Sequence, residues 1–275
     1  MTHLHFGWFP AFLALWAQGS APITHSGGAL VLSGGRYVDV RAGMLRPNGA
    51  ILVRDGRIVA LHPPGSDWRP AADARVLDLD GRTILPGLID GHVHLTLAGE
   101  PEANAAATLR AGFTTVIDLG SVNGAGVRLR DAIAQGRATG PRVIAAGSWI
   151  GSKGGVCEFG AATVGGVEEA RARARADLDG GADLLKVCVT GWPAEAVAFP
   201  DSVQLKAHLL GAVLETGAAA RRPVYAHAIG RAGALLAAAG GARVLAHTPM
   251  VDSAEAVRLR NAGIRVISTL ATLTA

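Results

Sequence analysis

The chain has 275 residues, of which 49% are apolar and 17% charged, and its formal net charge is +4. This composition supplies a sizeable core and excludes intrinsic disorder, a collagen-like repeat and a nucleic-acid-binding tail. The arginines are scattered, so we expect no nucleic-acid partner, and no apolar run reaches the roughly 18–20 residues of a membrane span.

Residues 1–25 are interpreted as a leader. The short apolar run at 9–16 precedes small residues at 17–21, which is typical of a signal peptide and its cleavage site. The segment before it contains His3 and His5 but no lysine or arginine, which a signal peptide would normally carry. Export and a mistranslated or disordered leader both stay open, so exported, periplasmic and cytoplasmic locations remain alternatives.

Residues 26–82 are expected to form a small β-sandwich-like module of antiparallel strands. Strand-like runs alternate here with turn residues, and Asp55-Gly56 between two such runs predicts a tight hairpin. The expected strands are 29–33, 36–40, 50–54, 57–61 and 75–79.

From residue 83 to residue 275, strand-like and helical patterns alternate, which predicts a parallel sheet. The expected strands are 83–88, 114–119, 142–146, 183–189, 224–227, 244–247 and 265–270. The expected helices are 101–111, 127–135, 167–178, 204–220, 232–239 and 253–262. Seven such units favour an α/β fold of the (β/α)8 TIM-barrel type over a doubly wound sheet. Because an eighth strand is missing, we expect an incomplete barrel, a truncated gene or an undercounted strand.

The strongest local signal is His92-Val-His94 near the start of this barrel. Residues two apart in a strand face the same way, so both imidazoles are expected to point into the barrel at a carboxyl end of a strand. Barrel enzymes build their sites at that end. Two imidazoles facing one point suit a borderline metal such as zinc.

Three further residues close or occupy later strands: Lys186, His227 and His247. Burial of Lys186 among Leu and Val should lower its pKa, so its amine could add carbon dioxide and become an anionic carbamate ligand. Alternatively, Lys186 extends to the barrel mouth or pairs with a carboxylate. Each histidine alone is more often structural, but their recurrence at strand ends predicts one common site. His62 and His208 lack such positions and are interpreted as surface or packing residues.

The chain resembles the amidohydrolase superfamily of metal-dependent hydrolases, and more closely its imidazolonepropionase-like and prolidase-like branch. The likeness rests on the first-strand motif at 86–94 and on the second-strand segment at 112–120, and it extends over residues 29–270. It implies two divalent metal ions, with zinc expected. The implied ligands are His92 and His94 for the buried ion, a carboxylated Lys186 as the bridge, and His227 and His247 for the second ion.

The chain departs from the family pattern after its seventh strand. The family carries an aspartate after its eighth strand, which binds the buried metal and transfers the proton, and no aspartate here occupies that position. No catalytic residue is therefore assigned. In the glycine-rich stretch 151–158, Cys157 and Glu158 either contact substrate or belong to a flexible loop. The apolar stretch 192–199 either lines a pocket or packs as a loop. Two cysteines are too few for a disulfide scaffold.

These features predict an enzyme that hydrolyses C–N bonds other than peptide bonds, in amides or cyclic amides, through a metal-activated hydroxide. The alternative is a catalytically incompetent remnant that at most binds metal. The expected partner is a small-molecule amide, and a homo-oligomer is possible.

Overall fold

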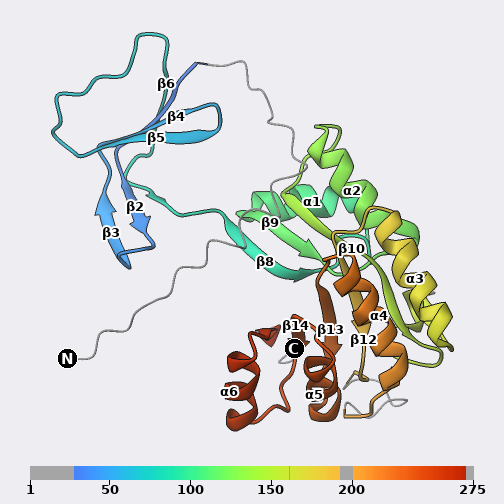
Figure 1. The fold of residues 1–275 in the computed structure, drawn as a ribbon. Coiled ribbons are helices and arrows are strands. Elements are labelled where there is room, and N and C mark those ends of the chain that lie inside the picture. The colour runs from blue at the N-terminus through green and yellow to red at the C-terminus, as the bar shows by residue number, and fades with distance from the viewer. Residues whose placement is uncertain (1–27, 161, 193–200, 271–275) are drawn as a thin grey trace. The chain divides into compact units, whose positions relative to one another are not determined.

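Figure 1 shows the computed structural model of the chain, which describes residues 28–160, 162–192 and 201–270. Two compact units divide between Gly87 and Leu88. The predicted leader and most of the apolar stretch 192–199 lie outside the described residues. No helix in the described ranges is long and apolar enough to cross a membrane.

The first unit consists of two small sheets. Its strands are β1 (Leu30–Ser33), β2 (Arg36–Asp39), β3 (Met44–Pro47), β4 (Ala50–Arg54), β5 (Arg57–His62), β6 (Arg75–Asp78) and β7 (Thr83–Ile84). The strand orders are β5-β4-β1-β6 and β3-β2-β7. The predicted hairpin is confirmed between β4 and β5, where Asp55 and Gly56 have φ of 48° and 70°. The β1–β6 and β2–β7 pairs are parallel, whereas only antiparallel pairs were expected.

The second unit alternates strands and helices as predicted. Its elements are β8 (Leu88–Val93), α1 (Pro101–Arg110), β9 (Phe113–Asp118), η1 (Val122–Gly124), α2 (Ala125–Ala134), β10 (Arg142–Ser152), η2 (Glu158–Gly160), β11 (Thr163–Val164), α3 (Val167–Asp179), β12 (Leu184–Cys188), α4 (Ala207–Ala219), β13 (Val224–Ala228), α5 (Arg231–Ala239), β14 (Val244–His247), α6 (Ser253–Asn261) and β15 (Arg265–Ile267). Seven parallel strands run in the order β15-β14-β13-β12-β10-β9-β8, and β11 pairs with β10.

The first strand of the barrel begins later than the sequence suggested. The expected strand at 83–88 is wrong, because Thr83 and Ile84 form β7 and pair with β2 in the first unit. Pro86 interrupts the run, since it has no N–H for a strand ladder and restrains the residue before it. The barrel strand is β8, whose last residues lead directly into the His-x-His pair.

The alternation of side chains along the strands creates two cores. In β12, Leu185 and Val187 pack outward against the helices, within a cluster that also includes Leu209, Val213 and Leu245. Leu184 faces inward and belongs to a second cluster. The other members of this inner cluster are Leu119, Ala146, Tyr225 and Val244, with Ile117, Ile144 and Ile267 packed against it. This inner cluster, which we call the apolar plug, packs inside the barrel. Polar residues farther along the same strand faces therefore lie beyond it, toward the carboxyl ends of the strands.

The barrel is nearly closed. A Cβ atom at Gly91 of β8 would lie 3.1 Å from the Ile267 side chain of β15, so the first and last strands approach each other. No backbone ladder joins these two strands in the described part of the chain. The Ile267 side chain packs over Gly91 and brings the two edges of the sheet close together.

Candidate metal centre

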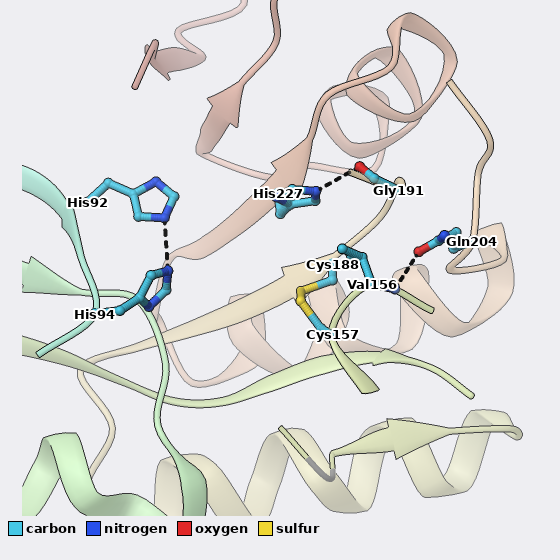
Figure 2. The surroundings of a disulfide bond; sticks show 8 residues. All are labelled: His92, His94, Val156, Cys157, Cys188, Gly191, Gln204 and His227. Carbon is cyan, nitrogen blue, oxygen red and sulfur yellow. Dashed lines mark hydrogen bonds between the residues drawn. A yellow bond between two sulfur atoms is a disulfide. The ribbon is translucent and has the colours of Figure 1, made fainter. Parts of the chain in front are cut away.

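A β-bulge in β8 aims the first two histidines. Along the pairing with β9, Asp90 faces Val116 and Val93 faces Asp118, so one extra residue is accommodated in β8. Bulges redirect neighbouring side chains. The Asp90 carboxylate accepts the backbone N–H of His92 at 3.0 Å and holds this turn of the chain. As a result, the Nε2 atoms of His92 and His94 lie 3.2 Å apart, as Figure 2 shows.

Lys186 lies on the inner face of β12, two residues beyond Leu184 of the apolar plug. Its side chain is 2% exposed. Within the described ranges, its ammonium group has no hydrogen-bond acceptor and no carboxylate partner. The pairing to a carboxylate that the sequence left open is therefore not found among these residues. Burial lowers the pKa of Lys186 to about 7.

His227 projects from β13 on the same face as Tyr225 of the plug. Its Nε2 atom lies 3.1 Å from the carbonyl oxygen of Gly191, which can only accept a hydrogen bond. Nε2 therefore carries the proton, and Nδ1 of His227 keeps a free lone pair.

His247 reaches the centre by a different route. Simple alternation in β14 would turn its side chain outward with Leu245, but His247 has φ of 79° and Thr248 has φ of 47°. Such backbone conformations cost a non-glycine residue about 1–3 kcal/mol. The Thr269 hydroxyl donates to the Ser268 carbonyl at 2.8 Å, so its oxygen accepts from Nδ1 of His247 at 2.5 Å. This leaves the Nε2 lone pair of His247 free.

The structure brings all four predicted histidines together. The ring centroids of His92 and His247 are 5.1 Å apart, and those of His227 and His247 are 4.7 Å apart. Lys186 is buried on β12, opposite Tyr225 in the pairing with β13, and its charge lowers the pKa of each of the four histidines. The predicted ligands from β8, β12, β13 and β14 thus meet at one end of the barrel.

Burial keeps these imidazoles neutral. It lowers the pKa of His94 to about 4 and the pKa values of His227 and His247 to about 3. The pKa of His92 falls well below its usual range for the same reason, with the Lys186 charge as the second cause. Neutral imidazole is the form of histidine that binds metal.

The donor set fits a divalent metal in one specific respect. Two nitrogen ligands of a tetrahedral zinc ion, each about 2.0–2.1 Å from the metal, lie about 3.3 Å from each other. The Nε2 atoms of His92 and His94 are 3.2 Å apart, close to that spacing. Among the described residues, no group of three or more His, Cys, Asp or Glu side chains is arranged so that it could hold a metal ion without side-chain movement. A charged Lys186 would also repel a cation, so the fit requires this amine to be neutral or carboxylated.

A disulfide that the sequence did not suggest borders the centre. Cys157 and Cys188 are joined, and Cys188 lies opposite His227 in the β12–β13 pairing. Figure 2 shows this bond next to His227, with the Val156 N–H donating to Gln204 Oε1 at 2.9 Å. Cys157 therefore offers no free thiol, and Glu158 is exposed on η2. Their contact with substrate stays a prediction.

Two tryptophans flank the histidines: Trp149, which the sequence did not single out, and Trp192, the first residue of the stretch expected either to line a pocket or to pack as a loop. Trp149 of β10 lies 5.6 Å from His94 between ring centroids and is 2% exposed. Trp192 lies 5.8 Å from His227 and 5.2 Å from His247. The position of Trp192 beside His227 and His247 agrees with the pocket-lining alternative for this residue.

A nearly closed barrel of parallel strands with buried histidines at its strand ends defines an α/β-barrel protein with a site in the usual place for that fold. The family model described as the amidohydrolase family matches residues 83–260, and the chain belongs to this family. Divalent metal ions are generally used in this family.

Curated relatives are similar over parts of their length. The chain is 35% identical over 107 residues to an imidazolonepropionase of Symbiobacterium thermophilum, covering 37% of this chain and 25% of the relative. It is 31% identical over 243 residues to adenine deaminase 2 of Rhizobium meliloti, covering 86% of this chain and 38% of that protein. The chain thus spans between about a quarter and two fifths of the length of these relatives.

Solved structures share the fold more extensively. A prolidase complexed with N-methylphosphonate-L-proline has a TM-score of 0.78 at 27% identity, covering 88% of this chain and 66% of that one. A Xaa-Pro dipeptidase with methionine in its active site has a TM-score of 0.77 at 26% identity, covering 89% of this chain and 67% of the dipeptidase.

Proposed function

We propose that this chain carries the metal centre of a hydrolase that cleaves C–N bonds of amides or cyclic amides. His92 and His94 would hold one divalent ion, and His227 and His247 a second. Lys186, as a carbamate, would bridge them. Zinc suits the nitrogen-rich donor set. The observation that carries the proposal is the convergence of the four histidines, with the two Nε2 atoms of the first pair 3.2 Å apart.

Bound ions would lower the pKa of water to give hydroxide and polarise the substrate carbonyl. In the overall reaction the water oxygen joins the carbonyl carbon, the C–N bond breaks and the nitrogen receives a proton. The chain's own contribution is to hold two of the proposed ligands in fixed tautomers. The Gly191 carbonyl accepts a hydrogen bond from Nε2–H of His227, and the Thr269 hydroxyl oxygen accepts one from Nδ1–H of His247. We assign no proton-transfer residue among the described residues.

A second candidate function is metal binding without turnover. Within the described ranges, no carboxylate is hydrogen-bonded to any of the four imidazole rings. Hydrolysis needs a group that passes the proton to the leaving nitrogen. A chain with ligands but no such group would bind metal and leave amides intact.

The test measures metal content and activity together. We expect the zinc-loaded chain to bind about two ions by elemental mass spectrometry, and His92→Ala to lose at least one. His208→Ala removes an exposed histidine of α4 and serves as the matched control that keeps both ions. Activity is measured on N-acyl amino acids, Xaa-Pro dipeptides and cyclic amides, with and without a zinc chelator.

Three results separate the candidates. Chelator-sensitive turnover that zinc restores supports the hydrolase. Full metal occupancy without turnover favours the binding protein. Undiminished activity in His92→Ala contradicts the assigned centre.

A further inference from the structure

Trp192 occupies a place that the metal chemistry itself does not require. Its indole lies against both histidines of the second pair, tilted by 31° to His227 and nearly perpendicular, at 81°, to His247. It follows Gly191, whose carbonyl fixes the His227 tautomer. The segment Gly191–Trp192 therefore fixes the tautomer of His227 and also supplies the aromatic side chain beside it.

The backbone before Trp192 is firmly anchored. Thr190 is fully buried, and its hydroxyl accepts the N–H of Ile229 at 2.8 Å. Thr190 also forms an isolated antiparallel bridge with Val203, and the Gln204 N–H donates to the Val189 carbonyl at 2.8 Å. These contacts fix the backbone at Val189 and Thr190, just before Gly191 and Trp192.

The two flanking tryptophans differ in what they offer. Trp149 is fully packed, because a Cβ at Gly120 or Gly160 would come within 2.5 or 2.6 Å of its ring. Trp192 is only partly buried, and its indole N–H has no hydrogen-bond partner in the described part of the chain. A held aromatic face with uncovered surface and a free donor is suited to contact a ligand.

We propose that Trp192 is a specificity-determining residue that selects substrates with an aromatic group attached directly to the reacting amide. This inference rests on the proposed function, since the amide is placed by the second histidine pair. An aromatic ring on such an amide would lie within stacking distance of an indole that is itself 5–6 Å from both histidine rings.

The experiment uses hydroxamic acids, which bind a metal through one common group and differ only in the attached ring. Acetohydroxamic acid has no ring, benzohydroxamic acid carries it on the carbonyl, and N-phenylacetohydroxamic acid carries it on nitrogen. Dissociation constants are measured by calorimetry on the zinc-loaded full chain. We expect at least one aromatic probe to bind about tenfold more tightly than acetohydroxamic acid, the gain typical of a stacked ring and its buried area.

Substitutions test whether Trp192 is the cause of the tighter binding of aromatic probes. Trp192→Ala is expected to reduce the ratio to about twofold or less, and Trp192→Phe to retain most of it. Phe159→Ala is the matched control, because Phe159 is exposed and contacts Trp149 on the other flank, with ring centroids 5.1 Å apart and the rings tilted. Zinc content and melting temperature show that each variant is folded.

The outcomes are distinguishable. Equal binding of all three probes to the unaltered chain, or loss of the preference in Phe159→Ala but not in Trp192→Ala, overturns the role of Trp192 and leaves the metal centre standing. Failure of the chain to bind zinc or acetohydroxamic acid overturns the proposed function and this inference with it.

Discussion

The two histidine pairs reach the same point by different physical means. His92 and His94 are neighbours on one strand, and strand alternation with one bulge is sufficient to aim both. His227 and His247 come from separate strands and depend on hydrogen bonds to Gly191 and Thr269. The first pair is therefore set by local structure and the second by tertiary contacts.

The two histidine pairs also have different surroundings. The first pair is next to the buried Asp118, whose carboxylate faces the Leu95 amide at the end of β8. The second pair is next to the disulfide and the anchored segment before Trp192. Perturbing one neighbourhood should affect one pair and spare the other.

The largest expected effect concerns Asp118. Burial raises its pKa to about 7, above the value of about 3.9 for an unfolded aspartate. Below about pH 4 the Asp118 carboxyl is protonated in both the folded and the unfolded chain, so no charge has to be buried on folding. Between pH 4 and 7 the free energy of unfolding falls, because the carboxyl ionises only in the unfolded chain. At pH 8 we expect Asp118→Asn to raise the free energy of unfolding by about 4 kcal/mol, with no change at pH 4.

Urea unfolding across this pH range measures the effect. The control is Asp131→Asn, which removes an aspartate that is only half covered and paired with Arg130 on α2. If the stability of Asp118→Asn follows the pH dependence of the unaltered chain, the buried carboxylate is not the cause.

The next effect concerns the disulfide. Cys157 and Cys188 are 31 residues apart, and closing a loop of that size stabilises a fold by about 3.7 kcal/mol. Replacing both cysteines by alanine should lower the free energy of unfolding by that amount and increase protease cleavage at residues 151–160. A thiol reductant should affect the unaltered chain and leave the double variant unchanged. Equal stability of the two oxidised proteins would contradict this.

The smallest expected effect concerns the hydrogen bond between Thr269 and His247. Thr269→Val removes the acceptor for Nδ1 of His247, and loss of such an orienting partner typically lowers metal affinity about 10–100-fold. We expect this loss for the second ion alone, with Thr269→Ser retaining most of the affinity. Competition with a zinc chelator measures both binding steps. Equal weakening of the two ions would show that the pairs are not independent.

The sequence predicted the features that short-range rules control. The alternation of strands and helices, the hairpin at Asp55-Gly56 and the common facing of His92 and His94 all depend on neighbours in the chain. The error at residues 83–88 was also instructive, because β7 and β8 are both extended and only their partners distinguish them.

The remaining features depend on contacts between distant residues. Alternation alone would have turned His247 outward, and its positive φ and its bond to Thr269 have no local signal. The disulfide likewise joins cysteines without a diagnostic spacing, and Trp192 gains its role only when β13 and β14 are placed beside it.

The burial of Lys186 has a consequence for chemical labelling. The chain has lysines only at positions 153, 186 and 206. Lys153 and Lys206 are exposed, whereas the Lys186 side chain is enclosed by the barrel. An amine-acylating reagent will therefore modify two lysines of the folded chain, and a third only when the barrel opens. In the metal-free chain, the mass added at Lys186 therefore reports that opening.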